Sequence, residues 1–264
     1  MKRRALASLA LVLAAGMWLP ACGANNTPRA LSYGENARRS YRNAFAAFED
    51  RDCLTADPLF QRIRREYPYS RYAALAELRL ADCAVIQNNY TEAIRAYRAF
   101  VRHRPAHADV PYAHFKIAEA YYRQIPQEFF LSPPPQERDQ TATRSALRQL
   151  RRFVLDYPES EHIEDAREMV RGALSLLARH ELYVAEFYLT RDRPQAAIGR
   201  LRHLLDVYEG SGIEPQALLL LGRVYLHMRE TLDAQRAFEE LIERFPESGY
   251  AEQAREFLRR FEET

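Results

Sequence analysis

The sequence predicts an all-α protein built as a solenoid of stacked helical hairpins, and three observations support this prediction. A ten-residue phrase occurs three times, as YPYSRYAALA at 67–76, YPESEHIEDA at 157–166 and FPESGYAEQA at 245–254. The chain of 264 residues has only 9 glycines, a composition that favours helices over a glycine-punctuated sheet. Apolar residues between the copies recur in one register. Because a catalytic site is needed only once, a returning phrase indicates a stacked framework.

The first 22 residues have the pattern of a lipoprotein leader. A basic MKRR is followed by the uncharged stretch ALASLALVLAAGMWL and then by LPAC. The stretch is short for a membrane span, so it predicts a secretory signal peptide over residues 1–21. LPAC resembles the lipobox of bacterial lipoproteins, which implies lipidation of Cys22; an ordinary secreted protein with a stray cysteine is the alternative. Gly23 replaces the aspartate that retains such proteins in the inner membrane. We therefore expect a chain anchored at the periplasmic face of the outer membrane, with residues 22–33 as lipidated cysteine and flexible tether.

Each copy of the repeated phrase places an aromatic residue before a proline and a serine two residues after it. Proline cannot continue a helix, so the aromatic residue ends one helix and the serine is a predicted N-cap of the next, at Ser70, Ser160 and Ser248. The intervening residues fit the 34-residue tetratricopeptide pattern, in which small side chains at positions 8 and 20 let two helices cross closely. The last unit fits best, with Leu218, Leu221, Gly222, Tyr225, Ala234, Phe238, Leu241 and Pro246 in the eight positions.

We therefore expect a tetratricopeptide-repeat domain over residues 34–264, in which each repeat supplies two helices. The predicted repeats are residues 36–68, 71–105, 109–158, 160–209 and 213–246, with a C-terminal capping helix at 248–262. The third repeat keeps the register only if an insertion at 126–141 is left out. The predicted helices of the repeats are 36–51, 53–67, 71–88, 90–103, 109–125, 142–157, 160–191, 194–208, 214–229 and 231–245. The helix from residue 160 is about thirty residues long, so it should protrude from the stack or bridge two halves of it.

The sequence offers little material for catalysis. It contains no glycine-rich phosphate loop and no nucleophile elbow, and its 7 histidines are scattered over different helices. We therefore expect no catalytic residue, no cofactor and no metal site. Three of the 38 basic residues lie in the predicted leader, so the remaining chain has nearly equal numbers of basic and acidic residues. This balance argues against nucleic acid as a partner.

Two cysteines lie in helices that are predicted to pack antiparallel. Helices 53–67 and 71–88 should be joined by a turn near residue 68, which places Cys53 opposite Cys83. Because an oxidising compartment favours pairing, we hypothesise a disulfide that clamps the first two repeats. Two buried free thiols are an equal alternative, since cysteine is itself a common core residue.

The insertion RQIPQEFFLSPPPQERDQT at 123–141 carries two phenylalanines, three consecutive prolines and a charged run. We expect a stiff loop that is ordered at one end. Phe129 and Phe130 are expected to pack under neighbouring helices. Together with Arg138 and Asp139, they form a predicted contact surface for a partner.

Several segments resemble the BamD (formerly ComL) family of outer-membrane lipoproteins. These are YPYSRYA from residue 67, RPAHADVPYAHF from 104, FF with RDQT inside the insertion, ALRQLRRFVLDYPES from 146 and ARHELYVAEFYLTRD from 178. The last two segments and RDQT are not general tetratricopeptide features. One departure is YEGSG at 208–212, which replaces the usual YP of the fourth repeat.

The resemblance implies a component of the β-barrel assembly machine. Members of the family bind BamA, a barrel protein, through its POTRA domain and help receive unfolded outer-membrane protein precursors. Arg200 matches the family's arginine that faces BamA, although a solvated arginine is the alternative. Tyr67 matches the tyrosine linked to precursor recognition, although the packing of a helix-closing aromatic residue would also explain it. The resemblance implies scaffolding and capture without bond chemistry.

Two other functional classes are open. An adaptor lipoprotein of another envelope complex, pilotin-like or Tol-linked, would have the same stack of repeats. A peptidoglycan-acting enzyme, or its activator, would need a cleft with paired carboxylates, and the sequence does not single out such a pair.

Overall fold

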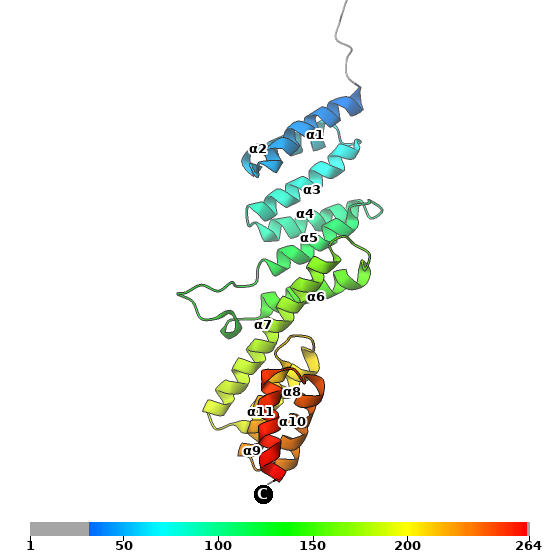
Figure 1. The fold of residues 1–264 in the computed structure, drawn as a ribbon. Helices are drawn as coiled ribbons and strands as arrows, with labels where there is room; N and C mark the ends of the chain where they lie inside the picture. Colours follow the sequence, from blue (N-terminus) through cyan, green and yellow to red (C-terminus); the bar gives the residue numbers. More distant parts are fainter. Residues whose placement is uncertain (1–31, 263–264) are drawn as a thin grey trace, which may run out of the picture.

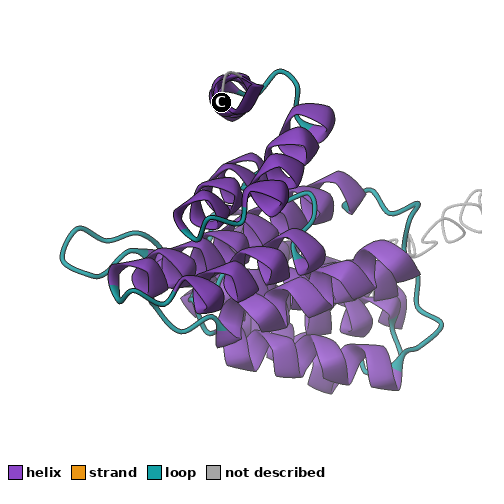
Figure 2. Cartoon of the chain, turned by 90° about the horizontal axis from the view of Figure 1, so that it is seen from below, coloured by secondary structure: helices purple, strands orange, loops and turns teal. Residues whose placement is uncertain are grey.

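The computed structural model describes residues 32–262, and this part of the chain consists of helices and connecting loops without a strand (Figure 1 and Figure 2). The predicted leader and Cys22 lie outside the described residues. The elements are α1 (Tyr33–Glu49), α2 (Cys53–Glu66), α3 (Arg71–Ile86), α4 (Tyr90–His103), α5 (Val110–Tyr122), the 3-10 turn η1 (Pro135–Glu137), α6 (Thr141–Asp156), α7 (Ile163–Thr190), α8 (Pro194–Val207), α9 (Glu214–His227), α10 (Thr231–Arg244) and α11 (Gly249–Glu262). Helices adjacent in sequence pack against each other along the whole stack, which confirms the predicted all-α solenoid.

The structural repeat follows the predicted register. The small residue expected at position 20 is fully buried in all five units, as Ala56, Ala93, Ala146, Ala197 and Ala234. The large residue four positions later is fully buried as well, as Phe60, Tyr97, Leu150, Leu201 and Phe238. The small side chains allow a close helix crossing, and the large ones fill the space toward the neighbouring helices.

Four of the turns inside the hairpins share one backbone conformation. A residue that is not glycine adopts a positive φ two positions before the second helix, with values of 59°, 60°, 54° and 62° at Arg51, Asn88, Asp192 and Arg229. The next backbone N–H donates to a carbonyl five residues back, as from Asn89 to Ala84 at 2.7 Å. This arrangement ends the first helix and reverses the chain. The insertion occupies the corresponding place in the third unit.

The helix boundaries agree with the predicted ones to within three residues, and the differences have local causes. α1 begins at Tyr33 because Ser32 and Glu35 form a reciprocal capping box, with Ser32 N and Glu35 Oε2 2.7 Å apart. Ser70 caps α3 as predicted, since its Oγ accepts from Ala73 N at 3.3 Å. The prediction for Ser160 was wrong: its Oγ accepts from His162 N, and α7 begins only at Ile163.

The long helix α7 bridges two parts of the stack. Its N-terminal half packs in one core cluster, where Ala166 joins Phe115 and Phe153. Its C-terminal half packs in the next cluster with α8, α9 and α10 (Figure 1). α11 covers the end of the stack by packing on α9 and α10. Within residues 32–262, the helices are too short or too polar to cross a membrane.

A buried carboxylate joins three helices in the N-terminal half. Asp82 of α3 accepts from Arg79 at 2.6 Å, from the hydroxyl of Tyr112 of α5 at 2.7 Å, and from the hydroxyl of Tyr97 of α4. Burial and the charge of Asp82 both raise the pKa of Tyr97, so its hydroxyl stays a donor. These contacts hold α3 and α4, two of the three helices around the groove described next, against α5.

Candidate functional site

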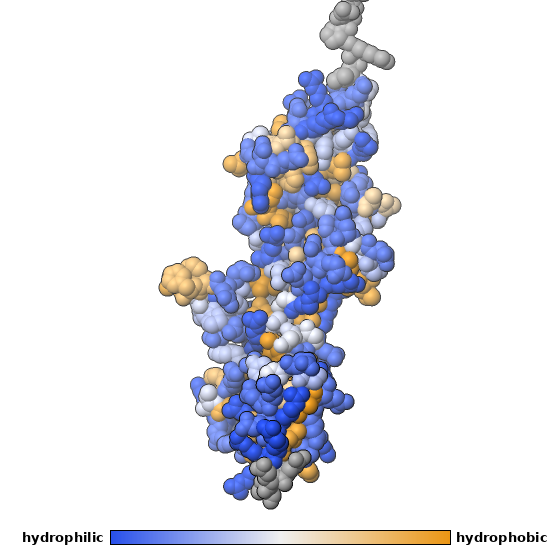
Figure 3. All heavy atoms as spheres, in the orientation of Figure 1, coloured by the Kyte–Doolittle hydropathy of each residue, from blue (hydrophilic) through white to orange (hydrophobic). Residues whose placement is uncertain are grey.

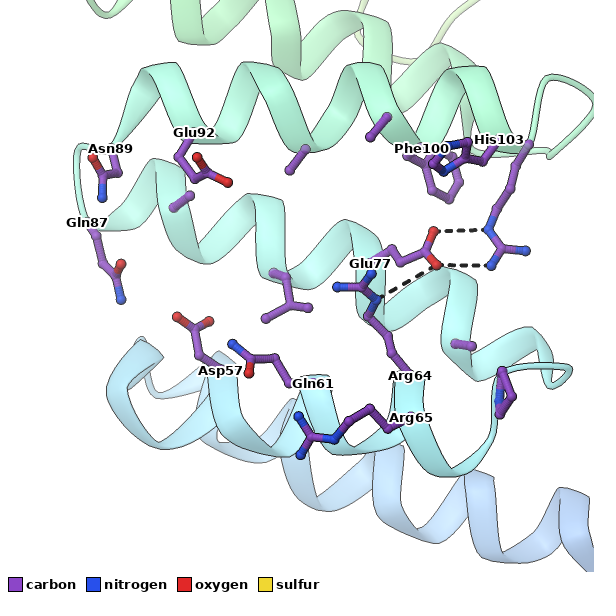
Figure 4. Close-up of a pocket in the computed structure, with 17 residues that line it drawn as sticks. Asp57, Gln61, Arg64, Arg65, Glu77, Gln87, Asn89, Glu92, Phe100 and His103 are labelled. Carbon is purple, nitrogen blue, oxygen red and sulfur yellow. Dashed lines mark hydrogen bonds and ion pairs between the residues drawn. The ribbon is translucent and has the colours of Figure 1, made fainter.

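A groove of about 670 Å³ lies between α2, α3 and α4 (Figure 4). Its floor is mostly made of short side chains, Ala73 and Ala84 of α3 and Ala96 and Ala99 of α4, with Leu80 of α3 beside them. Because these side chains are small, the backbone of α3 is recessed between the two neighbouring helices. The groove is partly open to solvent.

The charges of the groove are separated along its length. Asp57 and Glu92 lie at one end, and Arg64, Arg65 and His103 line the other end (Figure 4). Burial raises the pKa of Asp57, and its Oδ1 is buried without a hydrogen-bond partner among the described residues. The side-chain amides of Gln61, Gln87 and Asn89 supply further donors and acceptors. This arrangement can hold the backbone of an extended peptide and favour one direction of that peptide.

Glu77 stands at the centre of the basic end and is held by two arginines. Arg104 forms a bidentate pair with it, with Nε–Oε2 and Nη2–Oε1 distances of 3.0 and 3.1 Å. Arg64 approaches from α2, with Nε 3.8 Å from Glu77 Oε1. The hydrogen bond with Glu77 raises the pKa of Arg104. Arg65 forms no ion pair with the carboxylates of residues 32–262, so its guanidinium is free for an incoming carboxylate.

Tyr67 lies beside this groove, although its side chain is not among those that line it. It is the C-cap residue of α2, and its ring packs edge-on against Tyr33 with the centroids 5.3 Å apart. Its sequence neighbours Arg65 and Pro68 do line the groove. Tyr69, which sequence reasoning missed, is 96% exposed at the same corner. The exposure of Tyr69 could have been inferred from the sequence, because the residue lies in the connection between two helices and occupies no position that the repeat pattern buries.

Arg200 lies at the other end of the solenoid, on α8 (Figure 1). Its Nη1 is 3.1 Å from Oε2 of Glu181, a carboxylate of α7 that is almost fully buried. Burial by itself would lower the pKa of Arg200, but the hydrogen bond and the charge of Glu181 raise it. The arginine side chain remains 43% exposed, so one side of the guanidinium is accessible to a partner. The structure therefore does not bring Arg200 and Tyr67 into one site.

Cys53 and Cys83 form a disulfide in the structure, with their Cα atoms 5.4 Å apart. The bond joins the first turn of α2 to the last turn of α3, and both residues are buried. It ties α2, one wall of the groove, to α3, which carries much of the floor.

The expectation that Phe129 and Phe130 pack under helices was wrong, because their side chains are 57% and 87% exposed. The base of the insertion is held by hydrogen bonds, such as Arg138 Nε to Pro133 O at 2.7 Å and His180 Nδ1 to Gln136 O, also at 2.7 Å. The tip projects from the side of the solenoid (Figure 1) as an apolar knob (Figure 3). The side chain of Arg138 is therefore engaged in a hydrogen bond within the loop.

Asp139 also has a local role, since it accepts from the backbone N and the hydroxyl of Thr141 at 2.6 and 2.9 Å. These hydrogen bonds lower the pKa of Asp139 and anchor the start of α6. Among the described residues, no cluster of three His, Cys, Asp or Glu side chains could hold a metal ion.

Comparisons with known proteins place this geometry in a family. The family YfiO, described as outer membrane lipoprotein, matches residues 34–231, and a tetratricopeptide repeat matches residues 216–248. The chain is similar to the outer membrane protein assembly factor BamD of Caulobacter vibrioides, with 30% identity over 71% of this chain and 59% of that protein. The BamD of Xylella fastidiosa is 24% identical over 90% of this chain and 82% of that protein.

The match therefore spans about three fifths of the Caulobacter relative and most of the Xylella one. Among solved structures, the TPR2AB domain of yeast Sti1, in its complex with pHSP90, aligns over 83% of this chain and 81% of that chain, with 10% identity and a TM-score of 0.44. The family match covers most of the described helices, from α1 to the start of α10. The chain belongs to the YfiO family of outer membrane lipoproteins, which it resembles in its BamD-like segments and its tetratricopeptide repeats.

Proposed function

We propose that this chain is a lipid-anchored component of the β-barrel assembly machine. In this role it scaffolds a BamA-like barrel protein through its POTRA domain and receives unfolded outer-membrane protein precursors. The observation that carries the proposal is the family match over residues 34–231, together with relatives named outer membrane protein assembly factor BamD. Acylation of Cys22 would hold the solenoid at the periplasmic face of the outer membrane.

The groove between α2, α3 and α4 is the proposed site for precursors. An unfolded precursor presents an extended backbone with a mixture of apolar and polar side chains, and the groove offers amides, an apolar floor and separated charges. Tyr67 and the exposed Tyr69 lie at its basic end and extend the contact surface. Binding of this kind needs no bond chemistry, so the proposed role is not enzymatic.

The C-terminal half is the proposed site for the BamA-like protein. Arg200 presents part of its guanidinium to solvent while Glu181 fixes its orientation, which suits recognition of a carboxylate. The groove and Arg200 are at opposite ends of the stack, so a precursor and the barrel protein can bind at the same time (Figure 1). The exposed tip with Phe129 and Phe130 is a proposed additional contact surface.

Depletion of the protein followed by quantitative profiling of outer-membrane proteins tests the overall role. Barrel proteins should fall in abundance while α-helical envelope proteins stay constant. Unchanged barrel levels would contradict the proposal. Co-purification in mild detergent separates it from the adaptor alternative, because recovery of a POTRA-bearing barrel protein supports it and recovery of a secretin or a Tol protein instead overturns it.

The groove is tested by charge reversal of Arg65, with Arg62→Glu as the matched control. Arg62 is on the same helix but outside the groove, where it pairs with Glu66 at 2.7 Å. Arg65→Glu should reduce cross-linking of an unfolded barrel precursor several-fold, whereas Arg62→Glu should not. Equal cross-linking by the two variants would remove the groove from the proposal and leave the scaffold role intact.

A further inference from the structure

A second groove, of about 610 Å³, lies on the surface between the C-terminal half of α6 and the N-terminal half of α7. Its apolar lining residues are Val154, Leu155, Pro158 and Val170. Its remaining lining residues are the three arginines Arg151, Arg167 and Arg171. We propose that this groove docks an amphipathic segment of a partner protein that carries carboxylates beside an apolar anchor.

Leu155 is the first reason for the proposal. It occupies position 29 of the third repeat and is 79% exposed. The same position is charged in every other repeat, as Arg65, Arg102, Asp206 and Glu243. The packing of the repeat therefore does not require an apolar residue here. Single exposed leucines are common on protein surfaces, but this one adjoins the side chains of two half-buried valines and a proline in a concave surface.

The second reason is the positive charge of the three arginines, which form the rim of the groove. Arg167 is paired with Glu164 of its own helix, with Nη1 and Oε1 2.5 Å apart. Arg151 and Arg171 form no ion pair with a carboxylate anywhere in residues 32–262. They stand on opposite helices across the apolar lining, and no acidic residue lines the groove. A guanidinium fork matches a carboxylate in geometry, so the rim selects for acidic side chains at both edges of the bound segment.

The shape of the groove favours a protein segment over the other anionic surfaces that combine apolar and negative groups. A bilayer with anionic headgroups is flat, whereas the apolar lining lies in a recess between two helices. An amphipathic segment can insert one or two apolar side chains while its carboxylates reach the arginines. The groove is distinct from the one between α2, α3 and α4, and from the surface around Arg200, so this inference is independent of the function proposed above.

The test uses the full acylated chain in micelles of a nonionic detergent. The probe is a fluorescein-labelled peptide of alternating leucine and glutamate pairs, and its binding is measured by anisotropy against micelles without protein. Leu155→Asp and the double variant Arg151→Glu/Arg171→Glu should each weaken binding at least tenfold. The matched controls Leu232→Asp, at a 71% exposed leucine of α10, and Arg236→Glu, also on α10, should leave binding within twofold.

A peptide with lysine in place of glutamate should bind at least tenfold more weakly than the acidic peptide. The proposal is overturned if the acidic peptide does not bind, or if Leu155→Asp and Leu232→Asp weaken it equally. It is also overturned if Leu155→Asp abolishes association with phosphatidylglycerol vesicles, or self-association in sedimentation, and leaves peptide binding unchanged. Circular dichroism of each variant checks that the fold is intact, which is expected because the substituted side chains are exposed.

Discussion

Arg200 donates a hydrogen bond to Glu181 across the crossing of α8 and α7, and the two side chains differ strongly in exposure, at 43% and 6%. The arginine is therefore both a surface residue and the counter-charge of a buried carboxylate. Removing it changes the surface available to a partner and also leaves Glu181 buried without its ion pair. A loss of partner binding in an Arg200 variant has two physical causes that must be separated.

Arg200→Ala should lower the free energy of unfolding by about 1–3 kcal/mol, because a buried charge loses its partner. Chemical denaturation measures this change. Arg200→Ala/Glu181→Gln should recover at least half of the lost stability, since the unpaired charge is gone. If the double variant regains stability but still fails to bind the BamA-like protein, the arginine contacts the partner directly. An Arg200→Ala variant as stable as the parent would contradict the role of the ion pair.

Alanine substitutions of two helical glycines, Gly222 and Gly199, should have opposite effects on stability. A Cβ on Gly222 of α9 would overlap the ring of Phe238 of α10, whereas a Cβ on Gly199 of α8 would meet nothing within 4 Å. Gly222→Ala should destabilise the protein by about 1–3 kcal/mol through overpacking. Gly199→Ala should stabilise it by about 0.5–1 kcal/mol, because alanine is the better helix former. Thermal unfolding of both variants checks this, and a stabilising Gly222→Ala would refute the close crossing.

The repeat made most of the fold predictable. Position 20 is always a small residue and position 24 always a large one. The burial of Ala197 and Leu201 therefore follows from the repeat pattern alone. The pattern also explains several boundaries, since proline or serine marks helix ends such as those at Pro68, Ser70 and Pro246. The exception at Ser160 arises because its hydroxyl accepts from His162 N in a turn instead of capping α7.

The candidate sites were less predictable from the sequence, because they depend on contacts that the repeat pattern does not specify. The insertion has no repeat, and its position is set by bonds to distant residues, such as that between Gln136 and His180. The sequence therefore did not predict that Phe129 and Phe130 are exposed. It also did not predict that Glu181 pairs with Arg200, since 19 residues separate them and the pairing depends on the angle at which α7 and α8 cross.

The disulfide between Cys53 and Cys83 should make the free energy of unfolding depend on redox conditions. The disulfide closes a loop with a sequence separation of 30, and it constrains the unfolded chain. Its loss in a Cys53→Ala/Cys83→Ala variant should lower the free energy of unfolding by about 2–4 kcal/mol. Thiol titration of the denatured protein without reductant should detect neither of these two cysteines. Two free thiols per chain would refute the pairing, and the same stability with and without reductant would refute its energetic role.

The YEGSG segment, which departs from the usual pattern of the family, is stabilised by a single carboxylate. Gly210 and Gly212 have φ values of 79° and 78°, which glycine adopts without strain. Glu214 of α9 accepts from the backbone N of Gly210 and from the backbone N and hydroxyl of Ser211, the latter two at 3.1 and 3.0 Å. Burial by itself would raise the pKa of Glu214. The hydrogen bonds to the charged form outweigh burial and lower the pKa below its ordinary value of 4.5.

The lowered pKa of Glu214 predicts a pH-dependent contribution to stability. A carboxylate whose pKa is lower in the folded state stabilises the protein above its unfolded pKa, and the contribution is lost as the pH falls through the folded value. Glu214→Gln should therefore cost about 1 kcal/mol at pH 7, where the charged hydrogen bonds are lost. The difference between the variant and the parent should shrink below about pH 4.5, because the carboxylate of the unfolded chain is protonated there first and that of the folded protein only at lower pH. Urea denaturation from pH 3 to 7 measures it, with the exposed Glu247→Gln as control, and a difference that does not change with pH would show that Glu214 acts through packing.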